Sequence, residues 1–439
     1  MNDGAADSVI SPAVSGSAGT SLPSRLRTSS FARNVGATLA NRVLLLSIGL
    51  ITSVVIARLL GPEGRGLYAV AVAVGAIGVQ LGNLGLHASN TWAVARDRGL
   101  LGPLIANSAV VSIGIGGAAA AAVWIVAVLR PDLSPLPVGL LSLALVSVPL
   151  GLAYLLWQNL LLGTDRIRAY NGIDLLNKSL GLALIAALAL AGWLTAMSAF
   201  LVVALATGLA AAVSLGLLFM DEQSGAIRPR LELLREHARY GTKAYLAAFA
   251  SFLVLRLDML MVQYLRGSKD AGYYSIAVTL AEVVFLGPVV VGTILFPRLA
   301  SMGDDEHRWR VARSVAALIA ALMPLAAAVA WIAGGPVIGS LFGPEFQPAE
   351  PAFAWLLPGL TALAVHTVFM NYFAAVGMPP ITLVAPLVGL AINVVLNLWL
   401  IPRAGILGAS LASSAAYVAM LVLSGTYFLK YPRRFSDAA

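Results

Sequence analysis

Charged side chains stand inside several stretches that are otherwise apolar enough to cross a membrane, and these residues are the most able to do chemistry. Arg256 and Asp258 interrupt the run FLVLRLDMLMV at residues 252–262. An arginine at the centre of a membrane helix costs about 2.5–3.5 kcal/mol on insertion scales, so it needs a partner, a ligand or a wet cavity. The other charged residues of this kind are Arg42, Asp174, Lys178 and Glu282.

The spacing of Arg256 and Asp258 indicates that each has its own surroundings. Residues two apart on a continuous helix point about 200° apart, so the two charges cannot neutralise each other along one face. Arg256 and Glu282 each lie roughly 15 Å from the turn between their helices, at about 1.5 Å per residue. This spacing permits an Arg256–Glu282 ion pair, and it equally permits Arg256 to face a cavity and contact a ligand. For Asp258, helix packing and a protonatable coupling site both remain open.

Asp174 and Lys178 are four residues apart, in the order that favours an ion pair along one helix. We expect them to neutralise each other, while Asn177 between them joins a polar wall. Arg42 lies near the start of the first apolar stretch. There it either anchors the helix at the membrane surface or forms a gate for an entering anion.

The residue types exclude several classes of chemistry. The chain has no cysteine, so it has no thiol nucleophile and no cysteine-ligated metal. Its four histidines are scattered without the spacing of a metal site, and we expect no metal and no cofactor. The sequence also lacks the motif of P-loop nucleotide hydrolases. These features favour a transport protein over an enzyme.

The composition of the chain indicates which structural elements carry these charged residues. Of the 439 residues, 59% are hydrophobic and 11% are charged, whereas soluble domains carry about 25% charged residues. The net charge of +8 is spread over breaks between apolar stretches, so we expect no nucleic-acid partner. A span needs roughly 20 apolar residues, and the sequence predicts an all-α polytopic membrane protein. The approximate spans are 36–60, 66–88, 103–129, 136–162, 171–193, 196–219, 242–266, 271–297, 311–333, 348–376, 379–401 and 405–429.

The distribution of lysine and arginine predicts how these spans are oriented. Alternate breaks and the chain ends carry most of the 28 basic residues, which accumulate on the cytoplasmic side of membrane proteins. We therefore expect both termini in the cytoplasm, and Arg65 in an outer turn. The expected divisions are a disordered cytoplasmic tail at 1–30, a six-helix bundle at 31–220, an amphipathic cytoplasmic linker at 221–241, a second six-helix bundle at 242–430 and a cytoplasmic tail at 431–439.

The two predicted bundles carry similar segments after their first spans. RLLGPEGRGLYAVAVAV at 58–74 is similar to YLRGSKDAGYYSIAVTL at 264–280, since each has a polar turn with glycine, an aromatic residue and then small apolar residues. With six helices in each half, the second half enters from the same side as the first. This is a parallel repeat about an axis along the membrane normal, an arrangement that flanks a central cavity in many transporters.

These segments resemble the Wzx-type flippases of polysaccharide biosynthesis, in the multidrug/oligosaccharidyl-lipid/polysaccharide exporter superfamily. The resemblance extends over nearly the whole chain from about residue 31 to 430. The segments that carry it are IARLLGPEGRGLYAVA, LRLDMLMVQYLRGSKDAGYYSIAVTLAE, ILFPRLASM, LFGPEFQPAEPAFAWLLPGL and INVVLNLWLIPRAGILGASLAS.

The resemblance implies a bacterial inner-membrane protein with two bundles around a central cavity. It would move an undecaprenyl-pyrophosphate-linked oligosaccharide from the cytoplasmic to the outer leaflet by alternating access. Membrane lipids and the polymerase and glycosyltransferases of the same pathway are the implied partners. The candidates for contacts to pyrophosphate and glycan are Arg256, Arg42, Lys178 and Asn177. The candidates for ion coupling are Asp258, Glu282 and Asp174.

Two other functions remain open at this level. A cation-coupled exporter of small drugs or metabolites needs a compact acidic site in the membrane, which the three acidic candidates provide. The basic candidates make the membrane interior at least as basic as acidic, which favours an anionic headgroup instead. A membrane-embedded glycan polymerase or ligase usually has a large outer loop with reactive residues, whereas the outer loops predicted here are short.

Overall fold

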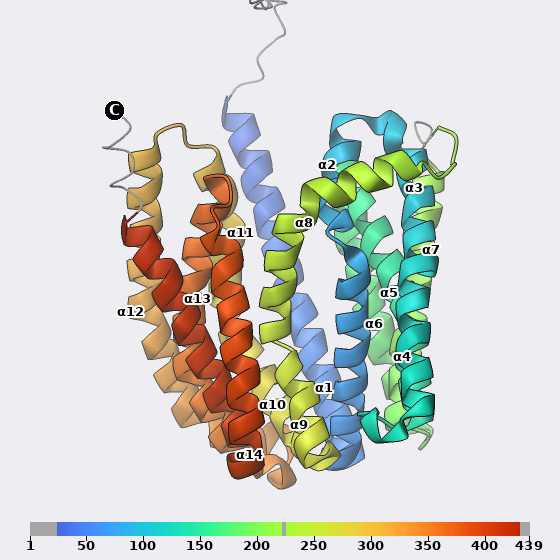
Figure 1. The fold of residues 1–439 in the computed structure, drawn as a ribbon, viewed down its shortest axis with the longest axis vertical. Helices are drawn as coiled ribbons and strands as arrows, with labels where there is room; N and C mark the ends of the chain where they lie inside the picture. The colour runs from blue at the N-terminus through green and yellow to red at the C-terminus, as the bar shows by residue number, and fades with distance from the viewer. Residues whose placement is uncertain (1–23, 222–224, 431–439) are drawn as a thin grey trace, which may run out of the picture. The chain divides into compact units, whose positions relative to one another are not determined.

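The structure is a computed structural model that describes residues 24–221 and 225–430, and the side chains among them except those of 24–40 and 236–243. The described residues divide into two units at Asn41, and the candidate site lies in the second unit, which begins there. Every regular element in the described ranges is helical (Figure 1), which confirms the all-α prediction. The predicted tails lie mostly outside the described residues, except that the first helix already begins at Ser24.

The helices follow one another with short connections. The α-helices are α1 (Ser24–Asn83), α2 (Leu86–Arg96), α3 (Leu101–Val110), α4 (Gly117–Leu129), α5 (Val138–Gly163), α6 (Ile167–Leu190), α7 (Ala196–Phe219), α8 (Leu231–Val254), α9 (Leu257–Arg266), α10 (Ser268–Val284), α11 (Leu286–Ala300), α12 (Asp305–Val337), α13 (Glu350–Ala375) and α14 (Ile381–Lys430). Short 3-10 or π segments are η1 (Arg98–Leu100), η2 (Val111–Gly116), η3 (Pro131–Leu133), η4 (Ile338–Phe342) and η5 (Pro344–Ala349).

Nine helices within the described residues are long and apolar enough to span a membrane, or ten when the bent pair α10 and α11 counts as one span. Two of them are too long for one crossing. α14 has 50 residues, and α1 has 43 from Asn41 onward, which at about 1.5 Å per residue is roughly twice the 30 Å of a bilayer core. Each contains a glycine with non-helical backbone angles, Gly61 in α1 and Gly405 in α14, and the chain turns back in both helices (Figure 1). The fold is therefore compatible with twelve crossings.

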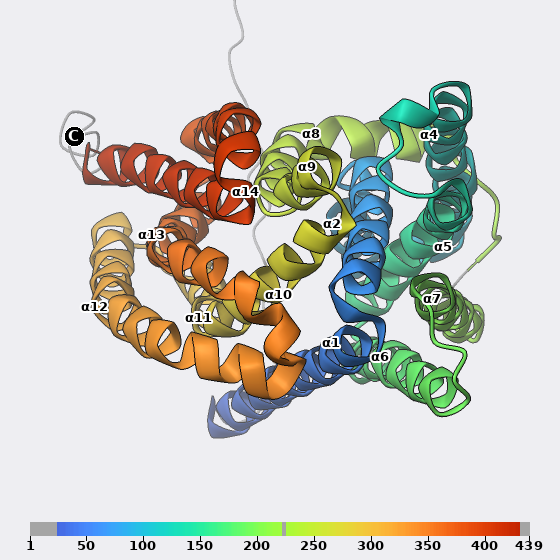
Figure 2. The same ribbon diagram turned by 90° about the horizontal axis from the view of Figure 1, so that it is seen from below.

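Two bundles pack within residues 41–430. α5 packs against α2, α4, α6 and α7, and α13 and α14 pack against α8 to α12; Figure 2 shows the two groups side by side. We call the end that holds Gly61, Gly267, Gly343 and Gly405 the turn end, and the opposite end, with Asn41 and Lys430, the terminal end. One hydrophobic cluster joins both bundles near the turn end, whereas each bundle has its own cluster near the terminal end.

The bundles touch at the turn end through two equivalent glycines. We call residues 61–68 the first turn segment and residues 267–274 the second. A Cβ atom on Gly66 would lie 1.8 Å from the Ser268 carbonyl oxygen, and one on Gly272 would lie 1.8 Å from the Pro62 carbonyl oxygen. The contact is reciprocal, because Pro62 and Ser268 occupy the same position in the two similar sequences. Only glycine allows the backbones to approach so closely.

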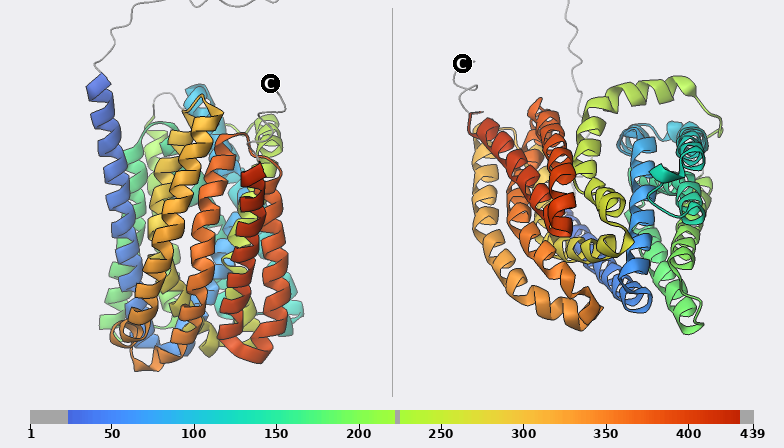
Figure 3. Two further views of the ribbon diagram at one scale, coloured as in Figure 1. Left: turned by 90° about the vertical axis from the view of Figure 1, so that its left-hand side faces the viewer. Right: turned by 60° about the horizontal axis from the view of Figure 1, so that its bottom comes forward.

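The segment between the bundles is helical from Leu231 and continues without interruption to Val254 as α8. Figure 3 shows that its first part runs across the end of the first bundle before the helix bends. Asn107 on α3 holds the start of α8 by two hydrogen bonds of 2.9 Å each, one to the carbonyl oxygen and one from the amide of Arg230. The second half of the segment predicted as a linker is therefore helical, and its helix is fused to the following span.

Candidate functional site

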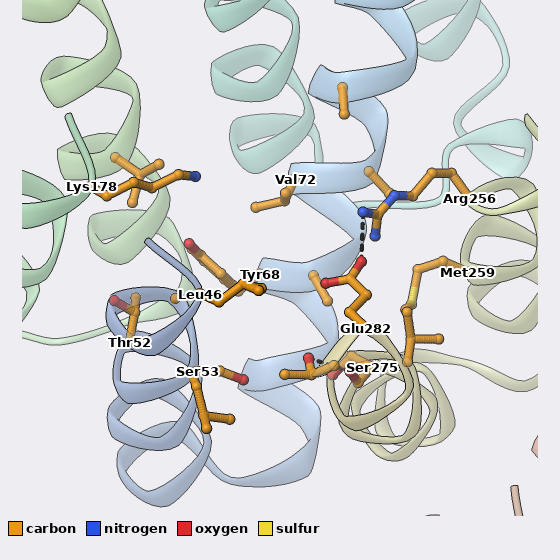
Figure 4. Close-up of a pocket in the computed structure, with 18 of the residues that line it drawn as sticks. Leu46, Thr52, Ser53, Tyr68, Val72, Lys178, Arg256, Met259, Ser275 and Glu282 are labelled. Carbon is orange, nitrogen blue, oxygen red and sulfur yellow. Dashed lines mark hydrogen bonds and ion pairs between the residues drawn. The ribbon is translucent and has the colours of Figure 1, made fainter. Parts of the chain in front are cut away.

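A cavity of about 500 Å³ lies between the two bundles, and Figure 4 shows many of the side chains that line it. Both arms of α1 and parts of α6 and α7 form one wall, and the break between α8 and α9 forms the other with α10. The polar lining residues of the first bundle are Thr52, Ser53, Arg65, Asn177, Lys178 and Thr207. Those of the second bundle are Arg256, Asp258, Ser275, Thr279 and Glu282.

Arg256 stands at a break in the helix and projects into the cavity. α8 ends at Val254 and α9 begins at Leu257, and the backbone angles of Arg256 (φ −133°, ψ −24°) are not helical. The assumption of one continuous helix through this stretch was wrong. The guanidinium donates to Glu282 on α10 at 2.7 Å, so the ion pair permitted by the sequence spacing is present. Both side chains are close to half-exposed, 40% and 46%, so the pair is open to the cavity.

Asp258 turns away from this pair into the second bundle, where it is buried. Its carboxylate accepts hydrogen bonds from the Tyr274 hydroxyl at 2.5 Å, the Ser413 hydroxyl at 3.0 Å and its neighbour's amide at 2.8 Å. The network continues, since Asn393 donates to Ser413 at 3.1 Å and Asn397 donates to Asn393 at 2.9 Å. Tertiary structure thus places this carboxylate in a polar network that draws on α10 and on both arms of α14.

Lys178 lies on α6, on the opposite side of the cavity from Arg256 (Figure 4). The expected ion pair between Lys178 and Asp174 is not among those formed by the described residues, so that prediction was wrong. Asp174 instead accepts a hydrogen bond from the Tyr154 hydroxyl of α5 at 3.1 Å. An exposed ion pair along a helix stabilises little, and a hydrogen bond to a charged group from a half-buried tyrosine is a stronger alternative.

Asn177 and Arg42 complete the set of predicted residues. Asn177 is 8% exposed, lines the cavity and accepts a hydrogen bond from Thr207 on α7 at 3.4 Å. Arg42 is exposed near the start of the second unit. Neither Arg42 nor Asp174 lines the cavity. The structure therefore gathers Asn177, Lys178, Arg256, Asp258 and Glu282 at one cavity, and leaves Arg42 and Asp174 outside it.

Sequence reasoning missed Arg65, which it assigned to an outer turn. The side chain is only 7% exposed and lines the cavity. Its Nε and Nη2 atoms donate to Ser275 at 3.1 Å and Thr279 at 3.3 Å on α10, and its guanidinium lies over the Tyr68 ring. Pro62 could have signalled this position, because proline favours the first turn of a helix and places Arg65 inside the second arm of α1.

The match to a family model assigns the chain to a family. Residues 31–303 match the model described as polysaccharide biosynthesis protein, which is more than half of the chain. The chain therefore belongs to this family, and the predicted polysaccharide exporter and flippase superfamily is confirmed.

Two curated relatives are archaeal. The chain is 24% identical over 196 residues to an uncharacterized membrane protein of Methanocaldococcus jannaschii, covering 44% of this chain and 38% of the relative. It is 19% identical over 207 residues to a probable low-salt glycan biosynthesis flippase of Haloferax volcanii, covering 46% of this chain and 44% of the relative. The matches span less than half the length of either relative.

Solved structures share the fold. The lipid II flippase MurJ in an inward closed conformation gives a TM-score of 0.72 at 12% identity, over 89% of this chain and 88% of that one. A multidrug resistance MATE family transporter in an inward-facing conformation gives 0.68 at 14% identity, over 89% of this chain and 94% of that one. The chain is a multi-pass membrane protein of a flippase and exporter family, and the relatives that have an assigned activity are flippases and transporters rather than enzymes.

Proposed function

We propose that this protein is a flippase that moves an undecaprenyl-pyrophosphate-linked oligosaccharide from the cytoplasmic to the outer leaflet for cell-surface polysaccharide synthesis. One observation carries the proposal. Arg65, Lys178 and Arg256 come from both bundles to one cavity inside the membrane-spanning region. Placing three cations there is costly, and a pyrophosphate that binds between them offsets that cost.

The charge balance of the cavity supports an anionic ligand. Asp258 faces the second bundle and Glu282 holds Arg256, so Lys178 and Arg65 have no carboxylate within ion-pair distance in the part of the chain that the structure describes. A pyrophosphate accepts charge-assisted hydrogen bonds from guanidinium and ammonium groups. The Arg256–Glu282 pair then acts as an exchangeable contact, in which substrate oxygens replace the Glu282 carboxylate.

The size of the cavity limits what it holds. About 500 Å³ is within the range of single small-ligand sites, roughly 300–1,000 Å³. This volume suits the pyrophosphate and the adjoining sugar rather than a whole oligosaccharide. The Asn177 amide and the hydroxyls of Thr52 and Thr207 are suitable partners for that sugar.

The orientation follows from the distribution of basic residues. The terminal end faces the cytoplasm of a bacterial inner membrane, and the turn end faces outward. Both chain termini are then cytoplasmic, on the side where glycosyltransferases complete the glycan. A polymerase of the same pathway receives the substrate on the other side.

Asp258 is the ion-coupling residue in this proposal. Of the three acidic candidates, Glu282 is engaged by Arg256 and Asp174 lies outside the cavity lining. Asp258 lies at the cavity wall within a buried polar network that includes Tyr274 and Ser413. Binding a cation there changes the charge of a buried site between helices of the second bundle, which can bias one conformation over another.

The fold likeness to multidrug transporters keeps drug export as a competing function. Reconstitution tests both. The full chain is placed in liposomes with a short-chain polyprenyl-pyrophosphate disaccharide in the inner leaflet, and a lectin outside reports its appearance. Matched liposomes contain the monophosphate-linked lipid, and a third set contains the cationic dye ethidium.

We expect movement of the pyrophosphate lipid, slower movement of the monophosphate lipid, and no export of ethidium. Arg256→Ala and Lys178→Ala should abolish lipid movement in protein that still inserts. Ethidium export without lipid movement would overturn the flippase proposal. Equal rates for both lipids would remove the role assigned to the pyrophosphate.

A further inference from the structure

Arg65 is a buried cation whose side-chain hydrogen bonds go only to neutral groups in the part of the chain that the structure describes. Its guanidinium donates to the hydroxyls of Ser275 and Thr279, and no carboxylate lies within ion-pair distance of it among residues 41–221 and 225–430 of known side-chain placement. A charged group buried among neutral partners carries an uncompensated desolvation cost. Such a group binds an incoming anion more strongly than it holds a hydroxyl.

The same contacts join the two bundles. Arg65 belongs to α1, whereas Ser275 and Thr279 belong to α10. They lie within one or two turns of the reciprocal contact of Gly66 and Gly272, where the two backbones meet. Separating the bundles at the turn end requires both hydrogen bonds to break.

Arg65 is also accessible to a ligand, because it lines the cavity that contains Arg256 and Lys178. A phosphate group in this cavity and the two hydroxyls of α10 therefore compete for one guanidinium. The guanidinium has five donors in a planar fork that fits phosphate oxygens in pairs. The hydroxyls of Ser275 and Thr279 occupy the Nε–Nη2 edge of this fork, so a phosphate that binds that edge in a bidentate contact displaces both of them.

We propose that Arg65 is an anion-binding residue that holds the bundles together at the turn end, and that the substrate's pyrophosphate releases this end by taking Arg65 from Ser275 and Thr279. The inference rests on the proposed function, because it requires a substrate with an anionic group. An empty protein keeps the turn end closed. Loading of the cavity and opening of its far end are thereby linked through one side chain.

The chain is suited to a direct distance measurement because it contains no cysteine. Glu63 and Lys269 are exposed and occupy equivalent positions in the two turn segments. The double variant E63C/K269C carries one spin label on each bundle at the turn end. The full chain in lipid nanodiscs is measured by pulsed electron resonance with inorganic pyrophosphate as the probe, and with sucrose as a neutral control.

Without ligand, we expect a single short distance between the two labels. As pyrophosphate is added, a second population with a longer distance between the labels should grow. In Arg65→Gln, the longer population should be present without ligand, and pyrophosphate should not change it. Arg65→Lys keeps the charge but loses the fork, and should need about tenfold more pyrophosphate, which corresponds to one charge-assisted hydrogen bond. The double variant Ser275→Ala/Thr279→Val removes the hydroxyls while keeping the cation, and should open the turn end and still bind pyrophosphate.

Arg58 supplies a matched control. It is an exposed arginine of α1 that also reaches the other bundle at the turn end, where it donates to the Leu341 carbonyl oxygen at 2.7 Å, but it does not line the cavity. Arg58→Gln should lengthen the label distance without abolishing the response to pyrophosphate. A generally loosened turn end would instead give Arg58→Gln and Arg65→Gln the same behaviour, and that result would overturn the proposal.

A short distance that persists in Arg65→Gln and still responds to pyrophosphate would equally overturn it. The outcome is separable from that of the proposed function. If the chain moves no glycan lipid but pyrophosphate still lengthens the distance through Arg65, the proposed cargo is wrong and the role of Arg65 stands. If glycan lipid moves and Arg65→Gln leaves the distances unchanged, the cargo stands and the role of Arg65 is wrong.

Discussion

The first and second turn segments share a backbone turn but differ in the charge of their side chains. Gly61 (φ 64°, ψ −176°) and Gly267 (φ 89°, ψ 178°) adopt nearly the same left-handed turn, and Gly66 matches Gly272 in a reciprocal contact. The first segment then places the cation of Arg65 at the cavity. The second segment has Ala271 at the equivalent position. Its last residue, Tyr274, instead donates a hydrogen bond to the buried Asp258 carboxylate.

The equivalent tyrosines at the ends of these segments show the same divergence. Tyr68 points into the cavity (Figure 4) and lies beneath the Arg65 guanidinium. Tyr274 is fully buried and donates to Asp258 at 2.5 Å. The repeated backbone thus forms the junction of the bundles. Side chains at matching positions differ, because the first segment places a cation at the cavity and the second holds a buried carboxylate.

The largest expected effect tests the symmetry of the backbone. Gly66→Ala and Gly272→Ala should each destabilise the protein by about 3 kcal/mol, the upper end for overpacking, because the added methyl group meets a carbonyl oxygen of the facing backbone. Thermal unfolding of the purified protein in detergent measures this. Gly216→Ala is the control, since nothing lies within 4 Å of the added atom. Unequal losses for the two turn glycines would break the symmetry.

A smaller effect tests the divergence of the tyrosines. Tyr274→Phe removes a donor from a buried carboxylate and should cost about 1.5–3 kcal/mol, as for other hydrogen bonds to charged groups. No hydrogen bond of the Tyr68 hydroxyl is present among the described residues, so Tyr68→Phe should change stability by less than about 0.5 kcal/mol. Chemical denaturation of both variants compares them. Equal losses would show that the two halves have not diverged at this position.

A smaller loss of stability than for Tyr274→Phe is expected at the ion pair between Arg256 and Glu282. Both side chains are close to half-exposed, so Glu282→Ala should cost no more than about 1 kcal/mol. Arg256→Ala should be similarly mild in unfolding but should abolish lipid movement in liposomes. The exchanged variant Arg256→Glu/Glu282→Arg distinguishes the roles. Restored transport in that variant would make the pair structural and contradict a role for Arg256 in binding substrate.

Much of the fold could be predicted from periodicity and composition. Long apolar stretches separated by glycine and proline predicted the membrane helices, since a bilayer requires about 20 apolar residues per crossing. The similarity of 58–74 and 264–280 predicted a repeat, and the turn angles of Gly61 and Gly267 now give it a structural basis. Residue spacing along two helices joined by a short turn also predicted that Glu282 can reach Arg256.

The surroundings of individual charges were harder to predict, because they depend on helices distant in sequence. The partners of Asp258 include Ser413, which lies 155 residues further along the chain. Asp174 has an acceptable partner four residues away, but the structure offers it Tyr154 instead. Arg65 looked like a loop residue because its surroundings in sequence are polar, while its burial comes from α10.

The sequence by itself determined that this chain is an all-α membrane protein of the polysaccharide biosynthesis protein family, because hydrophobic length and repeated turn motifs are local properties. Tertiary structure decided which charges share a cavity. The Arg65 contacts to α10 and the Asp258 network both join helices far apart in sequence, and the second arm of α14 supplies Ser413 only after the chain has turned at Gly405. The physical reason is that a charge inside a membrane is defined by its nearest partners, and only packing brings those partners together.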